Sequence, residues 1–275
     1  MREEEYDALP GLRSSEVKAG ATSMMHMHAA VTGPAKPDTD TFRWGRLVHA
    51  MLAEPDAIDA MPVWDGKTRR GAAWDAFSAM HADYINGEDE RAELVAMRAA
   101  VLSNPDVRPF LNRKWQTERV VTWCDEYGQG KARLDMASDD GIPTILEVKT
   151  TRSIEARAFG RQFSELAYHI QLGWYWRAGR KLWNVGPGCD DPAVYVLTIE
   201  SAPPYDSALI PVPHQVILEG YYAARMIALR YRECERSGVF PGRYWQERAE
   251  LVLPPWHGND GAAWTVTSEE GAEVI

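Results

Sequence analysis

The stretch "ARLDMASDDGIPTILEVKTTRS", residues 132–153, is the most informative part of the sequence for the fold. Two short runs rich in Leu, Ile and Val flank the turn-type residues "SDDGIP", a pattern typical of two consecutive β-strands. Asp135 lies in the first run, and Glu147 and Lys149 lie in the second. A bare Glu-x-Lys usually marks a solvated strand face. Because charged side chains are costly to bury, its combination with Asp135 indicates a functional site instead.

Strand geometry groups these charges. Side chains alternate between the faces of a strand, so Glu147 and Lys149 share one face and Val148 points to the other. We expect Asp135 to reach the same face from the neighbouring strand, with Glu118, in "QTERV", at the edge of the cluster. Carboxylates this close need a counter-charge, and Mg²⁺ accepts carboxylate, carbonyl and water oxygens. With Lys149 orienting or deprotonating a metal-bound water, the group suits phosphodiester hydrolysis.

The rest of the chain predicts one α/β domain. Helical patterns occupy 41–55, part of 57–87, 88–105, 156–178 and 213–238, and strand patterns occupy 115–151 and 192–205. No clean linker divides them, which favours a central mixed β-sheet flanked by helices in a single domain. We expect that domain to span 41–253, after an irregular N-terminal arm or lead-in at 1–40 and before a loosely held tail at 254–275.

The predicted helix that follows the strands adds polar candidates. "ELAYHIQLGWYWRAG", residues 165–179, places Tyr168, Gln171 and Tyr175 on one helical stripe. There they would overlook the carboxylates and hold a phosphate, a base or a metal-bound water; alternatively they are ordinary amphipathic boundary residues. Gly45 and His49, in "WGRLVHAML", also lie four residues apart on one helix face. The imidazole of His49 would complete a metal shell, although a lone helical histidine is more often structural.

Composition excludes several classes of protein. With 45% apolar and 25% charged residues the chain is an ordinary globular protein, without a membrane span or a recognisable signal peptide. Its three widely spaced cysteines fit neither a disulfide framework nor an iron–sulfur cluster, which indicates a reducing cytoplasm. A net charge of −10 argues against a sequence-independent nucleic-acid coat. A local basic groove is compatible with that charge, because fields are screened within about 8 Å.

Taken together, these residues resemble the PD-(D/E)xK nuclease superfamily. More narrowly they are similar to the branch of RecE-type (exonuclease VIII) and lambda-exonuclease-like enzymes, related to the RecB nuclease domain. The resemblance covers about residues 10–245, and it departs from the pattern at Leu134, where a proline commonly precedes the first acid. The motifs that carry it are "GRLVH" (45–49), "TER" (117–119), "ARLDM" (132–136), "LEVKTT" (146–151) and "QLGWY" (171–175), the last matching a Q-x-x-x-Y signature.

The resemblance implies a Mg²⁺-dependent exodeoxyribonuclease, in which Mn²⁺ can substitute. It would digest linear double-stranded DNA from its ends, 5′ to 3′, leaving 3′ single strands for homologous recombination or single-strand annealing. The metal ligands would be Asp135, Glu147, the Val148 carbonyl and His49. The catalytic residues would be Lys149, which activates water, Glu118, which assists a second metal or its water, and Gln171 and Tyr175, which support the geometry.

The resemblance also implies partners. Relatives form homo-oligomers, in some cases rings, and work beside a single-strand annealing protein of the RecT/Bet-like kind. A ring would keep the acidic surface outside and a basic lumen inside. The lumen would be lined by Arg43, Arg46, Lys67, Arg69, Arg70, Arg152 and Arg157. We expect a cytoplasmic protein of a bacterial cell, of phage or prophage origin.

Two other functions stay open at this point. The same residues would serve a structure-selective endonuclease or a CRISPR-associated (Cas-type) end trimmer, although the cysteine cluster of the iron–sulfur relatives is missing. The second alternative function is that of a nuclease-derived scaffold, which recruits an annealing protein and cuts nothing. The retained Asp135, Glu147 and Lys149 argue against loss of activity.

Overall fold

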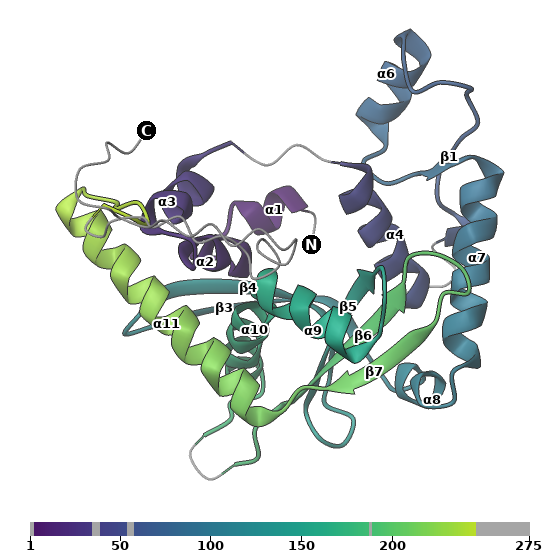
Figure 1. Ribbon diagram of the computed structural model, residues 1–275. Helices are drawn as coiled ribbons and strands as arrows, with labels where there is room; N and C mark the ends of the chain where they lie inside the picture. Colours follow the sequence, from purple (N-terminus) through teal and green to yellow (C-terminus); the bar gives the residue numbers. More distant parts are fainter. Residues whose placement is uncertain (1–2, 35–38, 54–57, 187–188, 246–275) are drawn as a thin grey trace, which may run out of the picture.

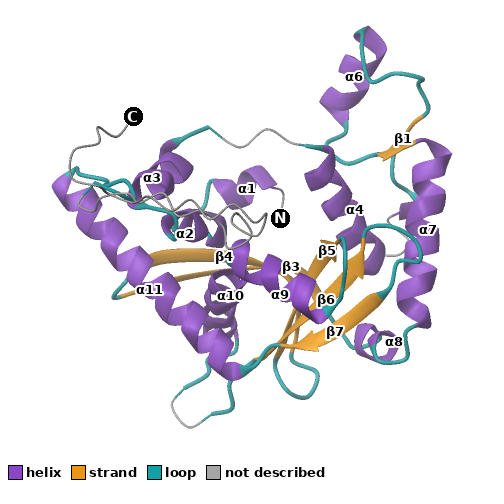
Figure 2. Cartoon of the chain, in the orientation of Figure 1, coloured by secondary structure: helices purple, strands orange, loops and turns teal. Residues whose placement is uncertain are grey.

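A five-stranded mixed sheet forms the centre of the computed structural model, which describes residues 3–34, 39–53, 58–186 and 189–245 (Figures 1 and 2). The strand order is β3-β4-β5-β6-β7, and only β5 and β6 pair in parallel. A parallel pair needs a crossover connection, supplied here by two helices, α9 and α10. The strands are β3 (Gln116–Asp125), β4 (Gly128–Ser138), β5 (Thr144–Thr151), β6 (Ala193–Glu200) and β7 (Ser207–Pro211).

Helices cover the sheet and divide the core into two clusters. One cluster joins α10 (Tyr168–Leu182) and α11 (His214–Ser237) to the sheet through buried residues such as Leu134 and Ile170. The other joins α4 (Asp40–Ala53) and α7 (Gly87–Ser103) to β5 and β6 through residues such as Leu47 and Val148. This arrangement confirms the predicted α/β class with a central mixed sheet flanked by helices.

The N-terminal segment is part of the fold, where the sequence predicted an irregular arm. It forms α1 (Glu3–Asp7), α2 (Ser14–Gly20) and α3 (Met24–Thr32). Leu12 bridges to Gly130 of β4, and the buried Lys131 donates hydrogen bonds to the carbonyls of Tyr6, Asp7 and Leu9 at 3.2, 3.0 and 2.6 Å. Since a buried ammonium must be hydrogen-bonded, Lys131 fixes this segment against the sheet. The tail predicted at 254–275 lies outside the described residues.

Two further predictions about local structure are wrong. The single helix expected over 156–178 is divided into α9 (Ala156–Glu165) and α10, because Ala167 between them has a left-handed φ of 51°. The strand β7 follows a turn containing Pro203 and Pro204, in a segment where the sequence predicted no strand. A single non-glycine residue with positive φ has no reliable sequence signal, which explains the first error.

A small lobe stands away from the sheet between α4 and α7 (Figure 1). It contains α6 (Ala72–Met80) and a short parallel pair of β1 (Val63–Trp64) and β2 (Ile85–Asn86). Its side chains form an aromatic cluster in which Trp74 contacts Trp64 and Tyr84 edge to face. Helix α8 (Val107–Leu111) lies near β7.

Helices α10 and α11 cross where two glycines meet the facing backbone. A Cβ at Gly220 would lie 1.8 Å from the carbonyl oxygen of His169, and one at Gly173 would lie 2.1 Å from the amide nitrogen of Tyr221. Such distances leave no space for a methyl group. The close crossing therefore sets the position of α10, which carries Gln171 and Tyr175.

Gly220→Ala is expected to lower the free energy of unfolding by about 1–3 kcal/mol, because an overpacked contact must push the two backbones apart. The measurement is urea denaturation monitored by circular dichroism. Gly160→Ala in α9 is the matched control, since a Cβ there would meet no described atom within 4 Å. We expect the control to be neutral or slightly stabilising. Equal effects of the two substitutions would contradict the close crossing.

Candidate active site

The site opens where β4 and β5 separate. Their pairing joins Met136 to Leu146 and continues only toward the turn, although the same register would place Asp135 opposite Glu147. At that point a side chain replaces the ladder: Asp135 Oδ2 accepts a hydrogen bond of 3.0 Å from the Val148 N–H. The predicted grouping of these two acids on neighbouring strands is therefore present.

Glu118 lies on β3, the strand on the other side of β4. The register pairs Thr117 with Met136 and Arg119 with Leu134, and the residue between them, Glu118, has a φ of 49°. A left-handed residue within a strand is an uncommon, strained conformation that often marks a functional site.

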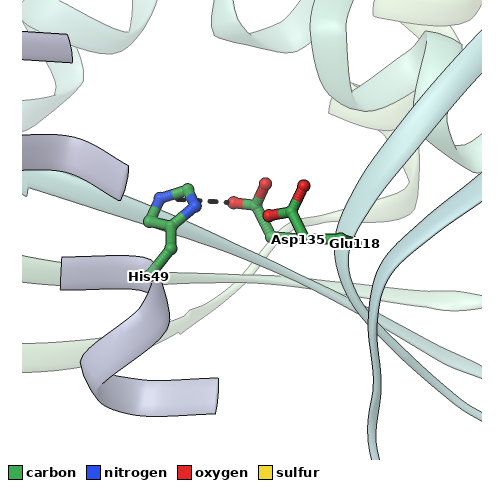
Figure 3. Close-up of side chains that lie close together, drawn as sticks. All are labelled: His49, Glu118 and Asp135. Atoms are coloured by element: carbon green, nitrogen blue, oxygen red, sulfur yellow. Dashed lines mark ion pairs between the residues drawn. The ribbon is translucent and has the colours of Figure 1, made fainter. Parts of the chain in front are cut away.

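Three potential metal ligands converge here from three elements (Figure 3). His49 from α4, Glu118 from β3 and Asp135 from β4 each offer a ligand atom, and these atoms lie within 4.8 Å of one another. His49 Nε2 is 3.7 Å from Asp135 Oδ2, and Glu118 also pairs with Arg133 at 2.8 Å. A Cβ added at Gly45, four residues before His49, would meet no described atom within 4 Å, so packing does not require a glycine there.

Glu147 is the most buried acid of the site, with 1% of its surface exposed. Its Oε1 accepts hydrogen bonds from Lys149 Nζ and, at 2.7 Å, from Gln171 Nε2. Its Oε2 is buried and has no hydrogen-bond partner among the described residues. Glu147 is not one of the three residues whose ligand atoms lie within 4.8 Å of one another, but Asp135 and His49 are close enough to shift its pKa. An orphaned carboxylate oxygen near these two residues fits a hard divalent cation, which prefers such ligands.

Burial also shifts the titration of these acids. It raises the pKa of Asp135 to about 6, against the charge of Lys149 and the Val148 hydrogen bond. Burial likewise raises the pKa of Glu147 to about 7, and the nearby Asp135 adds to the rise. The pKa of His49 is lowered, chiefly by burial, against the negative charge of Glu147. The site thus holds excess negative charge that a cation would offset.

Lys149 is held as a charged donor. Burial lowers its pKa, but the carboxylates of Glu147 and Asp135 raise it by more, so that the net shift is upward. Its Nζ also lies 5.0 Å from the centroid of the Tyr168 ring, a cation–π contact. The lysine therefore stays protonated at neutral pH.

The predicted stripe of α10 faces this group. Gln171 contacts Glu147 and also donates to the Tyr175 hydroxyl at 3.2 Å, and burial raises the pKa of Tyr175 well above its usual range. Sequence reasoning missed Lys18, whose Nζ donates to Gln171 Oε1 at 3.1 Å. It also missed Ser14, whose side chain opposes the rise in the pKa of Tyr175. Both come from α2, and no local pattern ties that segment to the strands.

The basic residues predicted to contact DNA divide into two groups. The structure corrects the prediction that Arg43 contacts DNA. Arg43 is buried, donates two hydrogen bonds of 2.7 and 2.8 Å to Glu90, and stacks on Tyr84, so it supports the lobe. Arg46 pairs with Asp83 at 2.6 Å, and Arg69 pairs with Asp40. The other members of the predicted set are exposed: Lys67, Arg70, Arg152 and Arg157.

Asp135→Asn is expected to raise the melting temperature by more at pH 8 than at pH 5, both in chelator. The folded-state pKa of about 6 lies above the ordinary 3.8. The folded protein therefore binds more protons than the unfolded chain between these values. The stability that the protonated carboxyl contributes is complete below about pH 4 and is lost as pH rises through about 6.

Calorimetry measures the melting temperature of the variant minus that of the wild type. We expect this difference to be larger by about 2–4 °C at pH 8 than at pH 5. Asp75→Asn, at an exposed position of α6, is the control and should show no such dependence on pH. An advantage of equal size at both pH values would contradict the assigned burial of Asp135.

Comparison with known proteins supports the fold. No family model and no curated protein matches the chain in sequence. The crystal structure of a candidate exonuclease from Eubacterium rectale is similar, with a TM-score of 0.61 and 13% identity over 95% of this chain and 99% of the other. A phage-related exonuclease from Haemophilus somnus 129PT gives a TM-score of 0.35 and 12% identity over 83% of this chain and 96% of the other. A TM-score this low carries no weight for the fold.

The first similarity shows that the two proteins share a fold, in agreement with the predicted central mixed sheet flanked by helices. It does not test the narrower assignment to the RecE-type branch, which stays a prediction. Among the helices that the structure describes, none has both the length and the apolar composition that a membrane span requires.

Proposed function

We propose that the protein is a metal-dependent deoxyribonuclease that hydrolyses phosphodiester bonds at the Asp135–Glu147–Lys149 site. The observation that carries the proposal is the buried Glu147 carboxylate, which has one oxygen bound by Lys149 and Gln171 and the other without a partner among the described residues. Buried charge of this kind is retained at a cost in stability. A function in catalysis accounts for that cost.

The roles follow from the chemistry of each side chain. Asp135, Glu147, His49 and the Val148 carbonyl would hold a divalent cation, with Glu118 close enough to assist. When bound, Mg²⁺ or Mn²⁺ supplies a polarised water and neutralises charge on the phosphoryl and leaving oxygens. Lys149, protonated beside the acids, donates hydrogen bonds that orient the attacking water or a phosphate oxygen. It becomes a proton acceptor only when the charge of the carboxylates is offset.

We infer attack on the ends of linear double-stranded DNA, 5′ to 3′, leaving 3′ single strands for recombination or annealing. The motif resemblance supports this direction, and the fold shared with a candidate exonuclease supports an exonuclease. Arg70, Arg152 and Arg157 are the exposed cations we assign to the DNA phosphates. Assembly into a homo-oligomer and work beside a single-strand annealing protein belong to the same proposal, as does a phage or prophage origin.

The direct test uses linear duplex DNA labelled at the 5′ or the 3′ end, and a covalently closed circle of the same sequence. With Mg²⁺ or Mn²⁺ we expect early release of the 5′ label, an intact circle, and no reaction in chelator. Nicking of the circle would favour the endonuclease alternative. Lack of hydrolysis with either ion would favour the non-cutting scaffold.

Lys149→Ala is expected to lower the turnover number by about 10²- to 10⁴-fold, the usual cost of removing a positioned proton-transfer group. Binding of the labelled duplex, measured by fluorescence anisotropy in Ca²⁺ or chelator, should persist. Lys181→Ala, at an exposed position near the end of α10, is the matched control. Turnover by Lys149→Ala within about threefold of the wild type would reject the role given to this lysine.

A further inference from the structure

We propose that Lys18 is a positioning residue of the site, which holds the side-chain amide of Gln171 so that its nitrogen faces Glu147. The inference rests on the proposed function and adds a residue that the motifs do not contain. Three contacts carry it. Lys18 Nζ donates to Gln171 Oε1 at 3.1 Å, Gln171 Nε2 donates to Glu147 Oε1 at 2.7 Å, and the same Nε2 donates to the Tyr175 hydroxyl at 3.2 Å.

Donor and acceptor chemistry allows one orientation of this amide. An ammonium group has donors alone, so Lys18 must meet the amide oxygen, whereas an ionised carboxylate has acceptors alone, so Glu147 must meet the amide nitrogen. Rotating the amide by half a turn would place Nε2 against the ammonium and Oε1 against the carboxylate. Gln171 is buried, with 8% of its surface exposed, so water cannot readily repair such a mismatch.

Of the other partners of Gln171, Glu147 requires this orientation only while it is ionised, and Tyr175 does not require it at all. The Tyr175 hydroxyl both donates and accepts, and it tolerates either orientation. Glu147 would also tolerate either one whenever it carries a proton, because a carboxylic acid can donate to Oε1. Lys18 accepts one orientation in both protonation states of Glu147. Among the described contacts, it is therefore the one that selects the amide orientation.

The fold keeps Lys18 in place independently of the site. It belongs to α2, and the segment before α2 is fixed to β4 by the Leu12 bridge and by the hydrogen bonds of Lys131. Its Nζ also lies 5.4 Å from the centroid of the Tyr168 ring, the same ring that Lys149 contacts. Helix α2 thus reaches the site through Lys18, in addition to Ser14 near Tyr175.

The consequence falls on Glu147. With the amide nitrogen and Lys149 both donating to Oε1, the orphaned Oε2 stays available for a cation. Residues that orient metal ligands typically change metal affinity or activity by about 10- to 100-fold when removed. The role assigned to Lys18 involves neither the carboxylate oxygens nor the reacting atoms, because it acts through Gln171.

The test is a double-mutant cycle with Lys18→Met and Gln171→Met, two length-matched substitutions. We expect Lys18→Met to lower kcat by about 10- to 100-fold with little change in KM. The double variant should be no more than about twofold below Gln171→Met, because residues that act through one another are not additive. Lys18→Arg should recover most of the activity, and Lys181→Met is the matched control expected to keep wild-type activity.

The second measurement is Mn²⁺ binding by isothermal titration calorimetry, which needs no turnover. Lys18→Met and Gln171→Met should weaken Mn²⁺ affinity by a similar factor, of about tenfold or more. If the wild type binds Mn²⁺ without cleaving DNA, the proposed function fails while this cycle still tests Lys18. The inference would be overturned if the losses in kcat of the two single variants multiplied in the double variant. Unchanged Mn²⁺ affinity would also overturn it, as would a loss confined to KM with a smaller salt slope, which would make Lys18 a DNA contact.

Discussion

The burial of the Glu147 carboxylate is the interaction on which the rest of the site depends. A buried acid must be hydrogen-bonded or paired, and here Lys149 and Gln171 satisfy one oxygen while the other stays without a partner among the described residues. Asp135 adds a second charge beside it. When both acids are ionised, their charge exceeds that of the one lysine, and a bound cation would offset the difference.

The sheet creates this situation by separating two strands. Pairing between β4 and β5 stops beside Asp135 and Glu147, and the Asp135 carboxylate takes over the hydrogen bond of the freed Val148 N–H. At this point in the sheet, α4 places His49 near Asp135, and α10 places Gln171 against Glu147. Helix α10 is in turn held by its close crossing with α11. Fold and site are therefore parts of one packing arrangement.

Sequence alone predicted the parts of this arrangement that depend on local periodicity. Strand alternation correctly grouped Glu147 with Lys149, and helical spacing placed Gln171 and Tyr175 toward the acids. The prediction from sequence failed where contacts between distant parts of the chain determine a side chain's partners. Arg43 resembles a free cation until Glu90, 47 residues away, is brought to it. Lys18 contacts Gln171 across 153 residues, and the break at Ala167 has no compositional signal. The strands that carry the acids and their faces could be predicted, but strand β7 and the long-range contacts of charged side chains could not.

The most direct test of the metal site is a crystal structure determined with Mn²⁺, in which anomalous scattering locates the ion. We predict a bound ion in contact with Asp135 and with the Oε2 oxygen of Glu147, near His49. A site that stays empty at saturating Mn²⁺, with Glu147 Oε2 bonded to another protein group, would contradict a cation as the partner of this carboxylate.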